Sequence, residues 1–295
     1  MNIMVKKIIR LAILGLFIGN TVFAQQKPLK HEMSVWGMGG LSTLKYDLRT
    51  GNHKDDFGGG AGIGYTYYFS KIVGLNAGIE FTFYNSKSII NHLETSYMTQ
   101  DFKGTEFLYK SAIDNYEEKQ RASYFNIPIQ IQVLYPIGAK SIFIAGGFKL
   151  GIPLSGNYKS EKGIIKTTGY YKYENHEYED IPALGFSTYS AKQGKEDYDV
   201  RIAYILSLEG GMKWRLPDNL FLYTGLYFDY GLNDIGKADR TNEFVQYNIE
   251  KPSKLINNGL LTSQFGNSER KESFTNKIYP MAFGVKVRLA FNLTN

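Results

Sequence analysis

The chain of 295 residues contains no cysteine. No disulfide can therefore stabilise it and no lipid can be attached through a thiol, so its stability must come from packing and backbone pairing. Histidine is also rare, and the four histidines lack the spacing of metal ligands. We expect neither a metal nor any other cofactor.

Long apolar runs are confined to the N-terminus. Lys6, Lys7 and Arg10 precede the run LAILGLFIG, and Val22 and Ala24 follow at the spacing that signal peptidase reads. The run is too short to span a bilayer comfortably and no stop-transfer charges follow it. We predict a secretory signal peptide over residues 1–24, cleaved before Gln25, and a single domain over residues 25–295.

The chain also has little excess charge of one sign. Its formal charge of +6 falls to about +3 when the three basic residues of the signal peptide leave. Nucleic acid is therefore not an expected partner. No segment after the N-terminus has 18 consecutive apolar residues, which excludes a helical membrane protein.

Apolar and polar residues alternate along much of the chain. In the C-terminal run YPMAFGVKVRLAFNL every second residue from Met281 to Leu293 is a large apolar one, and the residues between them are small or charged. This pattern predicts a strand with one apolar and one polar face. In a hydrocarbon layer the polar face and the backbone can be satisfied only if the sheet closes into a barrel.

Eight segments show this kind of pattern. They are residues 33–45, 57–69, 74–85, 121–135, 141–154, 199–216, 220–232 and 278–293. The faces of the first segment stay unassigned.

Short and long connections between these segments strictly alternate. The short ones are residues 70–73, 136–140 and 216–219, and the longest polar ones are residues 86–120, 155–198 and 233–277. This order predicts an all-β fold: an eight-stranded antiparallel up-and-down transmembrane β-barrel with long extracellular loops and both termini on the periplasmic side of the outer membrane.

A soluble lipocalin-like barrel is the alternative, and it requires apolar residues inside and polar residues outside. Here the polar parity carries small and charged residues that suit a narrow interior, so we favour the membrane barrel. Two aromatic girdles are expected at the interfaces. They would consist of Tyr67, Phe69, Tyr135 and Trp214 near the short turns, and of Phe83, Tyr124, Tyr230 and Tyr279 near the long loops.

The segments FGGGAGIGYTYYF, YFNIPIQIQVLYPIG and GVKVRLAFNL resemble the PorT-like outer-membrane β-barrel family. That family is similar in architecture to the OmpA transmembrane domain and to OmpX. The resemblance covers the whole mature chain and implies a barrel without implying one activity. It also implies the barrel-insertion machinery as a partner, although the chain does not end on an aromatic residue as porin-type strands do.

The polar parity places charges at similar heights inside the barrel. We expect a lumenal ion-pair network of Glu80, Lys149, Glu209, Asp229, Lys286 and Arg288. Lys149 is expected beside Glu209, and Asp229 beside Lys286, because an unpaired buried charge is costly. The network is either a gate for ions or structural filling, and we favour filling because an eight-stranded barrel is narrow.

The loops are the expected working surface. Candidate residues for recognising an extracellular protein or glycan are Tyr170, Tyr171, Tyr173, Tyr178 and Tyr189. Alternatively, these tyrosines pack a hairpin in which the fifth and sixth segments continue beyond the membrane. Basic residues of the 233–277 loop would pair with lipopolysaccharide phosphates or remain solvated; they are Lys237, Arg240, Lys251, Lys254, Arg270 and Lys271.

Catalysis has one weak candidate. His176 lies beside Glu177, Glu179 and Asp180, with Ser187 or Ser190 as nucleophile, but any acidic Tyr-rich loop offers such combinations. We therefore predict no enzymatic activity. The expected function is that of a structural or interaction protein embedded in outer-membrane lipid and lipopolysaccharide. The alternatives are a small gated porin and an accessory component of a secretion system.

Overall fold

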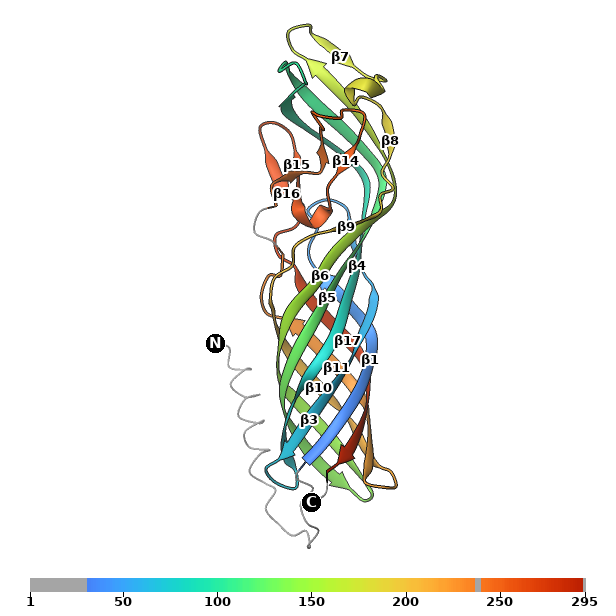
Figure 1. Ribbon diagram of the computed structural model, residues 1–295, viewed down its shortest axis with the longest axis vertical. Helices are drawn as coiled ribbons and strands as arrows, with labels where there is room; N and C mark the ends of the chain where they lie inside the picture. The colour runs from blue at the N-terminus through green and yellow to red at the C-terminus, as the bar shows by residue number, and fades with distance from the viewer. Residues whose placement is uncertain (1–30, 237–239, 294–295) are drawn as a thin grey trace, which may run out of the picture.

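Eight strands close a ring in the computed structural model, which describes residues 31–236 and 240–293. They are β1 (His31–Lys45), β3 (Phe57–Tyr68), β4 (Val73–Gln100), β5 (Glu106–Ile137), β6 (Lys140–Tyr171), β10 (Ala203–Arg215), β11 (Leu220–Gly231) and β17 (Tyr279–Asn292). Each pairs antiparallel with the ring strand before and after it, and β17 pairs with β1. The predicted eight-stranded up-and-down barrel is confirmed (Figure 1).

The short connections and both ends of the ring lie together. Ile137 pairs with Lys140 across a two-residue turn, and Leu216 donates its backbone N–H to Leu220 O. The start of β1 and the end of β17 are at this same end, at the bottom of Figure 1. The predicted signal peptide lies outside the described residues.

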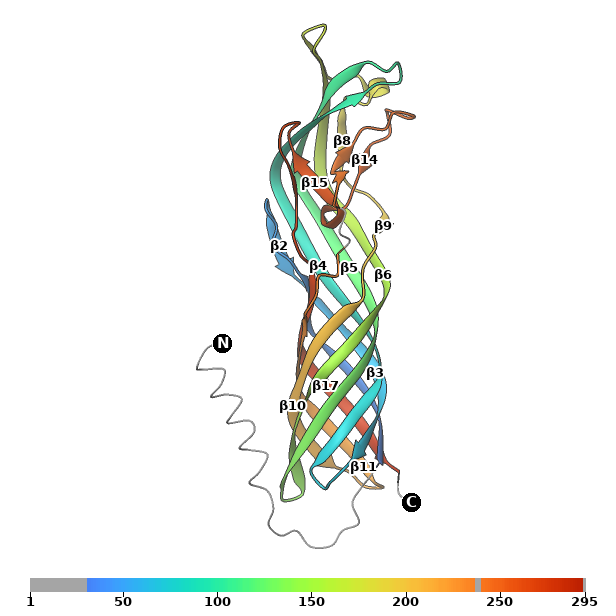
Figure 2. The same ribbon diagram turned by 90° about the vertical axis from the view of Figure 1, so that its left-hand side faces the viewer.

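Three strands are much longer than predicted: β4 has 28 residues, and β5 and β6 have 32 each. Residues 86–120, which we expected to be a loop, are instead mostly a hairpin that continues β4 and β5. The fifth segment does extend as β6, but its partner is β5, whereas the sixth segment begins only at Ala203. We call residues 86–100, 106–120 and 155–171 the blade. It rises beyond the barrel in Figures 1 and 2.

Short elements decorate the blade and the long loops. They are β2 (Asn52–Asp55), β7 (His176–Tyr178), η1 (Pro182–Leu184), β8 (Thr188–Ser190), β9 (Lys195–Asp197), β12 (Asn242–Glu243), β13 (Val245–Gln246), β14 (Ile256–Asn257), η2 (Leu260–Thr262), β15 (Ser263–Gly266) and β16 (Lys271–Ser273). β2 pairs with β4, and β7, β8 and β9 pair with β6. The blade is therefore widened into a larger sheet.

A separate core explains why the strands continue. The inner face of the blade contributes Phe107, Ile113, Tyr116 and Ile165 to it, and the segment after β11 covers that face with Phe244, Val245, Tyr247, Leu260 and Phe274. The described residues of the 233–277 segment thus form a packed cover rather than a free loop. Burial of these side chains stabilises backbone pairing that has no lipid to favour it.

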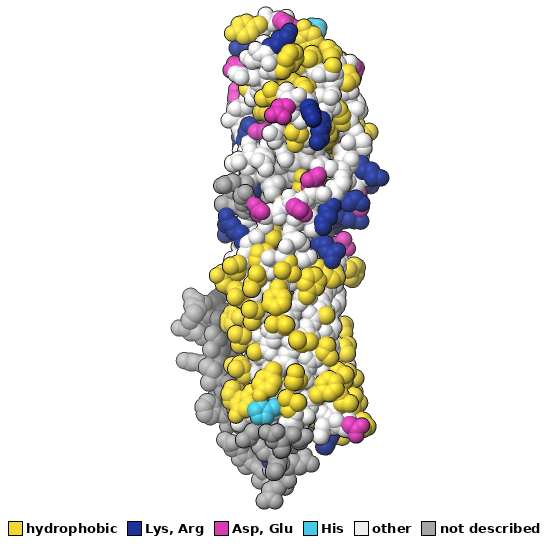
Figure 3. Space-filling view, viewed as in Figure 1, with side chains coloured by type: hydrophobic (Ala, Val, Ile, Leu, Met, Phe, Trp, Pro, Cys, Tyr) yellow, Lys and Arg dark blue, Asp and Glu magenta, His cyan; other side chains and the backbone are white. Residues whose placement is uncertain are grey.

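Below the blade, the polarity of the barrel is that of a membrane protein. Outward side chains such as Ile63, Ile144 and Val285 are 55%, 64% and 54% exposed, and apolar side chains form a band around the barrel in Figure 3. The interior holds buried polar and charged residues. The lipocalin-like alternative, with its opposite polarity, is therefore wrong.

Among the residues described, no helix is both long enough and apolar enough to cross a membrane.

One girdle residue was placed wrongly. Tyr124 is fully buried inside the barrel mouth and donates a hydrogen bond to Arg201 O at 2.9 Å. It belongs to the inward parity that it shares with Asn126, and only outward side chains can reach the interface.

The inward face of β1, which the sequence left unassigned, carries Trp36. Its indole lies over glycines of β3 and β4, because a Cβ built on Gly62, Gly64 or Gly78 would lie only 2.6, 2.8 or 2.9 Å from the ring. The glycines of the run FGGGAGIG therefore leave room for the Trp36 ring. No helix follows the run, so it cannot bind phosphate as a glycine-rich loop before a helix does.

We expect Gly62→Ala to destabilise the barrel by about 1–3 kcal/mol, since the new methyl group would overlap Trp36 and the Ile79 carbonyl. Gly37→Ala is the matched control, because nothing lies within 4 Å of a Cβ at that position. The measurement is urea unfolding in detergent micelles, with the folded fraction read from the heat-dependent electrophoretic shift of the barrel. Equal unfolding midpoints for the two variants would contradict this account of the glycines.

Candidate functional site

The middle of the lumen contains a connected set of charges. Lys149 Nζ lies 2.8 Å from Glu80 Oε1 and 2.8 Å from Asp229 Oδ2. Lys286 Nζ forms a close ion pair with Glu209 and lies 4.0 Å from Glu80 Oε2. All five side chains are nearly inaccessible to solvent. The structure thus places these five predicted residues together at mid-height.

The partners differ from those expected. We expected Lys149 beside Glu209 and Asp229 beside Lys286, but the register sets Lys149 opposite Ile205 and Lys286 opposite Gly225. In a narrow barrel a long side chain instead reaches across the lumen. Lys149 on β6 therefore meets Glu80 on β4 and Asp229 on β11, each two strands away.

Arg288 lies lower in the lumen and makes no carboxylate contact among the described residues. Its Nη2 donates to Gln132 Oε1 at 2.7 Å, and its guanidinium lies 4.1 Å from the centroid of the Tyr223 ring. A guanidinium can stack on an aromatic face while it donates in its own plane. Arg288 is therefore held by an amide and a ring.

A second charge cluster near the short turns was missed by the sequence analysis. Glu32 forms a close ion pair with Lys213 and accepts hydrogen bonds from Tyr223 Oη at 2.7 Å and Tyr68 Oη at 3.2 Å. Glu32 was overlooked because the first segment was begun at residue 33. Continuing the alternation of β1 backwards by one residue would have found it.

Trp36 was also missed as a member of the central network. Its Nε1 donates to Glu80 Oε2 at 2.9 Å, and Lys286 Nζ lies 4.5 Å from its ring centroid. Within the described barrel, four buried carboxylates (Glu32, Glu80, Glu209, Asp229) therefore face four buried cations (Lys149, Lys213, Lys286, Arg288). The lumen is close to electrically neutral, which reduces the cost of burying these charges.

Above the charges the lumen is closed by an apolar cluster. Tyr84, Tyr124 and Ile205 project inward from the barrel wall there, and Met38 and Tyr227 of the same cluster lie lower, opposite Lys286 and Glu209. Ile235, Leu261 and Ile278 join them from the 233–277 segment and its ends. The barrel mouth is thus plugged by side chains of the wall and of the cover together.

A buried carboxylate joins the cover to the blade. Glu118 accepts hydrogen bonds from Tyr116 Oη and Gln120 Nε2, both at 2.8 Å, and from the Leu260 amide at 3.2 Å. It is completely inaccessible and has no cationic partner among the described residues. Burial raises the pKa of Glu118 to about 7, against the lowering effect of these donors.

The candidate recognition tyrosines do not form one surface. Tyr171 is a core residue that stacks on Phe107 at 5.0 Å, and Tyr178 packs edge-on against Tyr171 at 5.5 Å. Tyr189 and Tyr170 are half-buried, and Tyr173 is 94% exposed at the β6–β7 turn. The inward-facing alternation of β6 buries Tyr171, and recognition by these five tyrosines stays a prediction.

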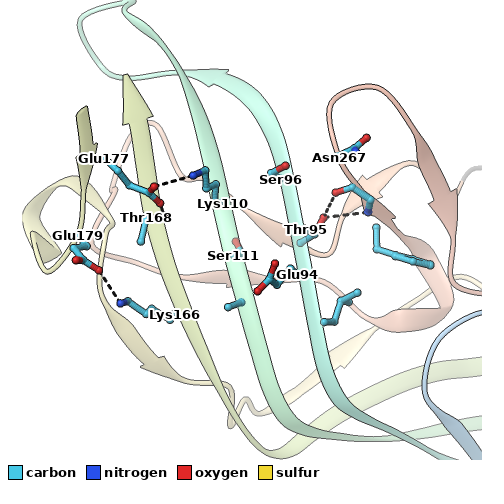
Figure 4. Close-up of a pocket in the computed structure, with 14 residues that line it drawn as sticks. Glu94, Thr95, Ser96, Lys110, Ser111, Lys166, Thr168, Glu177, Glu179 and Asn267 are labelled. Carbon is cyan, nitrogen blue, oxygen red and sulfur yellow. Dashed lines mark hydrogen bonds and ion pairs between the residues drawn. The ribbon is translucent and has the colours of Figure 1, made fainter. Parts of the chain in front are cut away.

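The outer face of the blade instead carries a groove of about 750 Å³ (Figure 4). Lys110 and Lys166 cross it to reach Glu177 at 2.8 Å and Glu179 at 2.7 Å. These carboxylates are therefore paired with lysines rather than with His176, the candidate catalytic base. The remaining lining residues are Leu93, Glu94, Thr95, Ser96, Ser111, Ala112, Thr168, Phe265, Gly266 and Asn267.

The basic residues of the 233–277 segment are mostly engaged within the protein. Arg240 is 7% exposed and binds Asp234 and the Thr275 carbonyl, while Arg270 and Lys271 pair with Glu272 and Glu243. Lys237 lies outside the described residues. Arg240 is thus structural, whereas either alternative, pairing with lipid phosphates or solvation, would require it to be exposed.

No protein-family model matches this chain, and no curated protein matches it. Among solved structures it is similar to Neisserial surface protein A, with 8% sequence identity over 91% of this chain and 100% of that chain and a TM-score of 0.35. It is also similar to a major outer membrane protein from Thermus thermophilus, with 11% identity over 88% and 99% of the two chains and a TM-score of 0.34. The translocator domain of the autotransporter NalP from Neisseria meningitidis matches at 8% identity over 98% and 95%, with a TM-score of 0.25.

These likenesses are remote, so the fold rests on the strand pairings of the chain itself. The resemblance to the PorT-like family stays a prediction.

Because burial raises the pKa of Glu118, we predict that docking of the cover onto the blade depends on pH. Because the docked state holds the proton more tightly, docking is strongest below the ordinary carboxyl pKa of 4.5 and weakens as pH rises through about 7. The total change is about 3 kcal/mol, and Glu118→Gln should abolish it. The measurement is hydrogen exchange at the Leu260 amide between pH 5 and pH 8.5, at rates corrected for intrinsic exchange.

Glu117→Gln is the control, because Glu117 faces the opposite side of the blade and pairs with Lys87 and Lys162. It should leave the pH dependence at Leu260 intact. The same pH dependence in Glu118→Gln as in the unaltered protein would rule out Glu118 as its source.

Proposed function

We propose that the protein is an integral outer-membrane barrel, exported through its N-terminal signal peptide, with both termini in the periplasm. The proposal is supported by the closed ring and the apolar band around it, which together satisfy the backbone and the outer surface in lipid. The shared position of the short turns and of both ring ends supports the orientation, since such barrels keep short turns on the periplasmic side.

Within this barrel we infer that the extracellular blade is the working part. This inference is based on the observation that β4, β5 and β6 continue beyond the ring with a buried core of their own. A sheet with its own core holds surface residues in fixed positions, which favours contact with an extracellular protein or glycan. The groove crossed by Lys110 and Lys166 is a hollow in that surface.

The interior supports a structural role for the predicted lumenal network. Four carboxylates and four cations compensate one another, and the apolar cluster with Tyr84 and Tyr124 lies above them. A gate would need both layers to open. We therefore propose that the network fills and stabilises the barrel, and that the protein acts by contact rather than by conduction.

We expect negligible conductance in planar bilayers for the unaltered protein. Glu209→Ala leaves Lys286 without its close partner but leaves the apolar cluster in place, so it should also stay closed. An open porin reconstituted in parallel is the positive control. Discrete conductance steps in the unaltered protein, or their appearance in Glu209→Ala, would revive the gated channel.

The groove is tested by filling it. Ala112→Trp places a large ring on its floor, whereas Thr105→Trp adds the same ring in the exposed β4–β5 turn. We expect Ala112→Trp to reduce capture of the extracellular partner at least tenfold and Thr105→Trp to leave capture unchanged. Partners captured from culture supernatant by the immobilised barrel are identified by mass spectrometry and glycan analysis. Identical capture by both variants and the unaltered protein would remove the groove from the proposal.

A further inference from the structure

Five lysines lie in one row across five adjacent strands. Lys54 on β2 is opposite Lys87 on β4, Lys87 is opposite Lys119 on β5, Lys119 is opposite Lys159 on β6, and Lys159 is opposite Lys195 on β9. Each member is thus the direct register partner of the next. We call these five residues the lysine row.

Electrostatic repulsion along the lysine row destabilises the sheet unless a ligand compensates the charges. Like charges directly opposite one another on a sheet destabilise it, and here the arrangement is repeated four times. Glu117 contacts Lys87, and Glu161 Oε2 lies 3.0 Å from Lys119 Nζ. Among the described residues, Lys54, Lys159 and Lys195 have no ion pair. Three exposed ammonium groups are left for something outside the chain.

The row faces away from the core of the blade. Lys87 has the same parity on β4 as Phe83, which belongs to the apolar band, and Lys54, Lys119, Lys159 and Lys195 are all exposed. Figure 3 shows basic side chains, with acidic ones among them, directly above the apolar band. The charges therefore point toward whatever surrounds the barrel at that height.

The height of Lys87 brings the row to the headgroup layer, and the row is inclined to the membrane plane because it runs perpendicular to tilted strands. Lys87 is four residues above Phe83 on β4, which at roughly 3.3 Å per residue and a tilt of roughly 40° raises its Cα by about 10 Å. The headgroup layer is roughly 5–7 Å thick on each side of a bilayer, and lysine side chains extend toward it. Arg121 marks the boundary, because its guanidinium lies 4.5 Å from the centroid of the Phe83 ring.

We propose that the lysine row binds the phosphate groups of anionic glycolipid in the outer leaflet. Lysine binds phosphate as a point charge with three donors, and phosphates bridging neighbouring ammonium groups would offset the repulsion along the row. The row lies at the base of the blade, on β2, β4, β5, β6 and β9, so bound lipid would lie against that side of the molecule. The inference rests on the proposed outer-membrane location.

The test compares two triple variants of equal charge. Lys54→Gln with Lys159→Gln and Lys195→Gln removes the three lysines without an ion pair and breaks no ion pair described here. Lys103→Gln with Lys172→Gln and Lys251→Gln removes three exposed lysines from the turns and the cover far from the row. The probes are detergent micelles doped with diphosphoryl lipid A or with its dephosphorylated form, and inorganic phosphate alone. Binding is measured by native mass spectrometry and by titration.

We expect the row variant to bind diphosphoryl lipid A at least tenfold more weakly than the unaltered protein, with the second variant unchanged. Dephosphorylated lipid A should bind weakly to all three proteins. Unchanged lipid A binding by the row variant, or an equal loss in both variants, overturns the proposal. So does complete displacement of lipid A by millimolar inorganic phosphate, which would indicate a site for the free ion.

The heat-dependent electrophoretic shift and protease protection in vesicles distinguish failure of the lysine-row proposal from failure of the proposed outer-membrane barrel. Normal insertion of all three proteins together with unchanged lipid A binding rejects the lysine row alone. Failure of the unaltered protein to insert into vesicles rejects the outer-membrane barrel, and the lipid site with it.

Discussion

The pairing of β1 with β17 is the contact on which the rest of the structure depends. It joins the two ends of the ring through fourteen successive residue pairs, from Glu32 opposite Asn292 to Lys45 opposite Tyr279. Without it, two strand edges would face lipid with unpaired N–H and C=O groups, each costing several kcal/mol. Once the ring of eight is closed, its interior is too narrow for anything but side chains.

That narrow interior explains the chemistry inside it. Every second residue of each strand must point inward, so the wall can carry charges only if they compensate one another at short range. Lys149 satisfies Glu80 and Asp229 together, and the glycines of β3 leave space for Trp36, which holds Glu80 from the other side. The same crowding that seals the lumen also positions its charges.

Above the barrel mouth, the inner face of the extended strands must be covered by other parts of the chain. β1, β10, β11 and β17 end near the barrel mouth, whereas β4, β5 and β6 continue, so the former inner face of the sheet would meet water. The 233–277 segment covers that face and also supplies Leu261 to the plug of the lumen. Glu118 lies where blade and cover meet, and burial raises the pKa of its carboxyl.

Much of the barrel could be predicted because it depends on local rules. Alternation over residues 278–293 and the seven similar segments defined strands, and the order of short and long connections defined how they pair. The extension of β4 and β5 was not predictable in this way. Residues 86–120 become strand because Phe244, Val245 and Leu260, more than a hundred residues later, bury the inner face of the hairpin.

The site residues divide in the same manner. Parity along a strand was enough to place Glu80, Lys149, Glu209, Asp229, Lys286 and Arg288 in the lumen, but their partners depend on reach across it and on register. The lysine row likewise depends on which residues of five strands stand opposite one another. The sequence alone determined that the chain forms a closed two-faced barrel with a polar interior, because side-chain alternation is a property of a single strand. Only the tertiary structure decided the ion pairs, the blade and the lysine row, because each requires the relative register of strands distant in the chain.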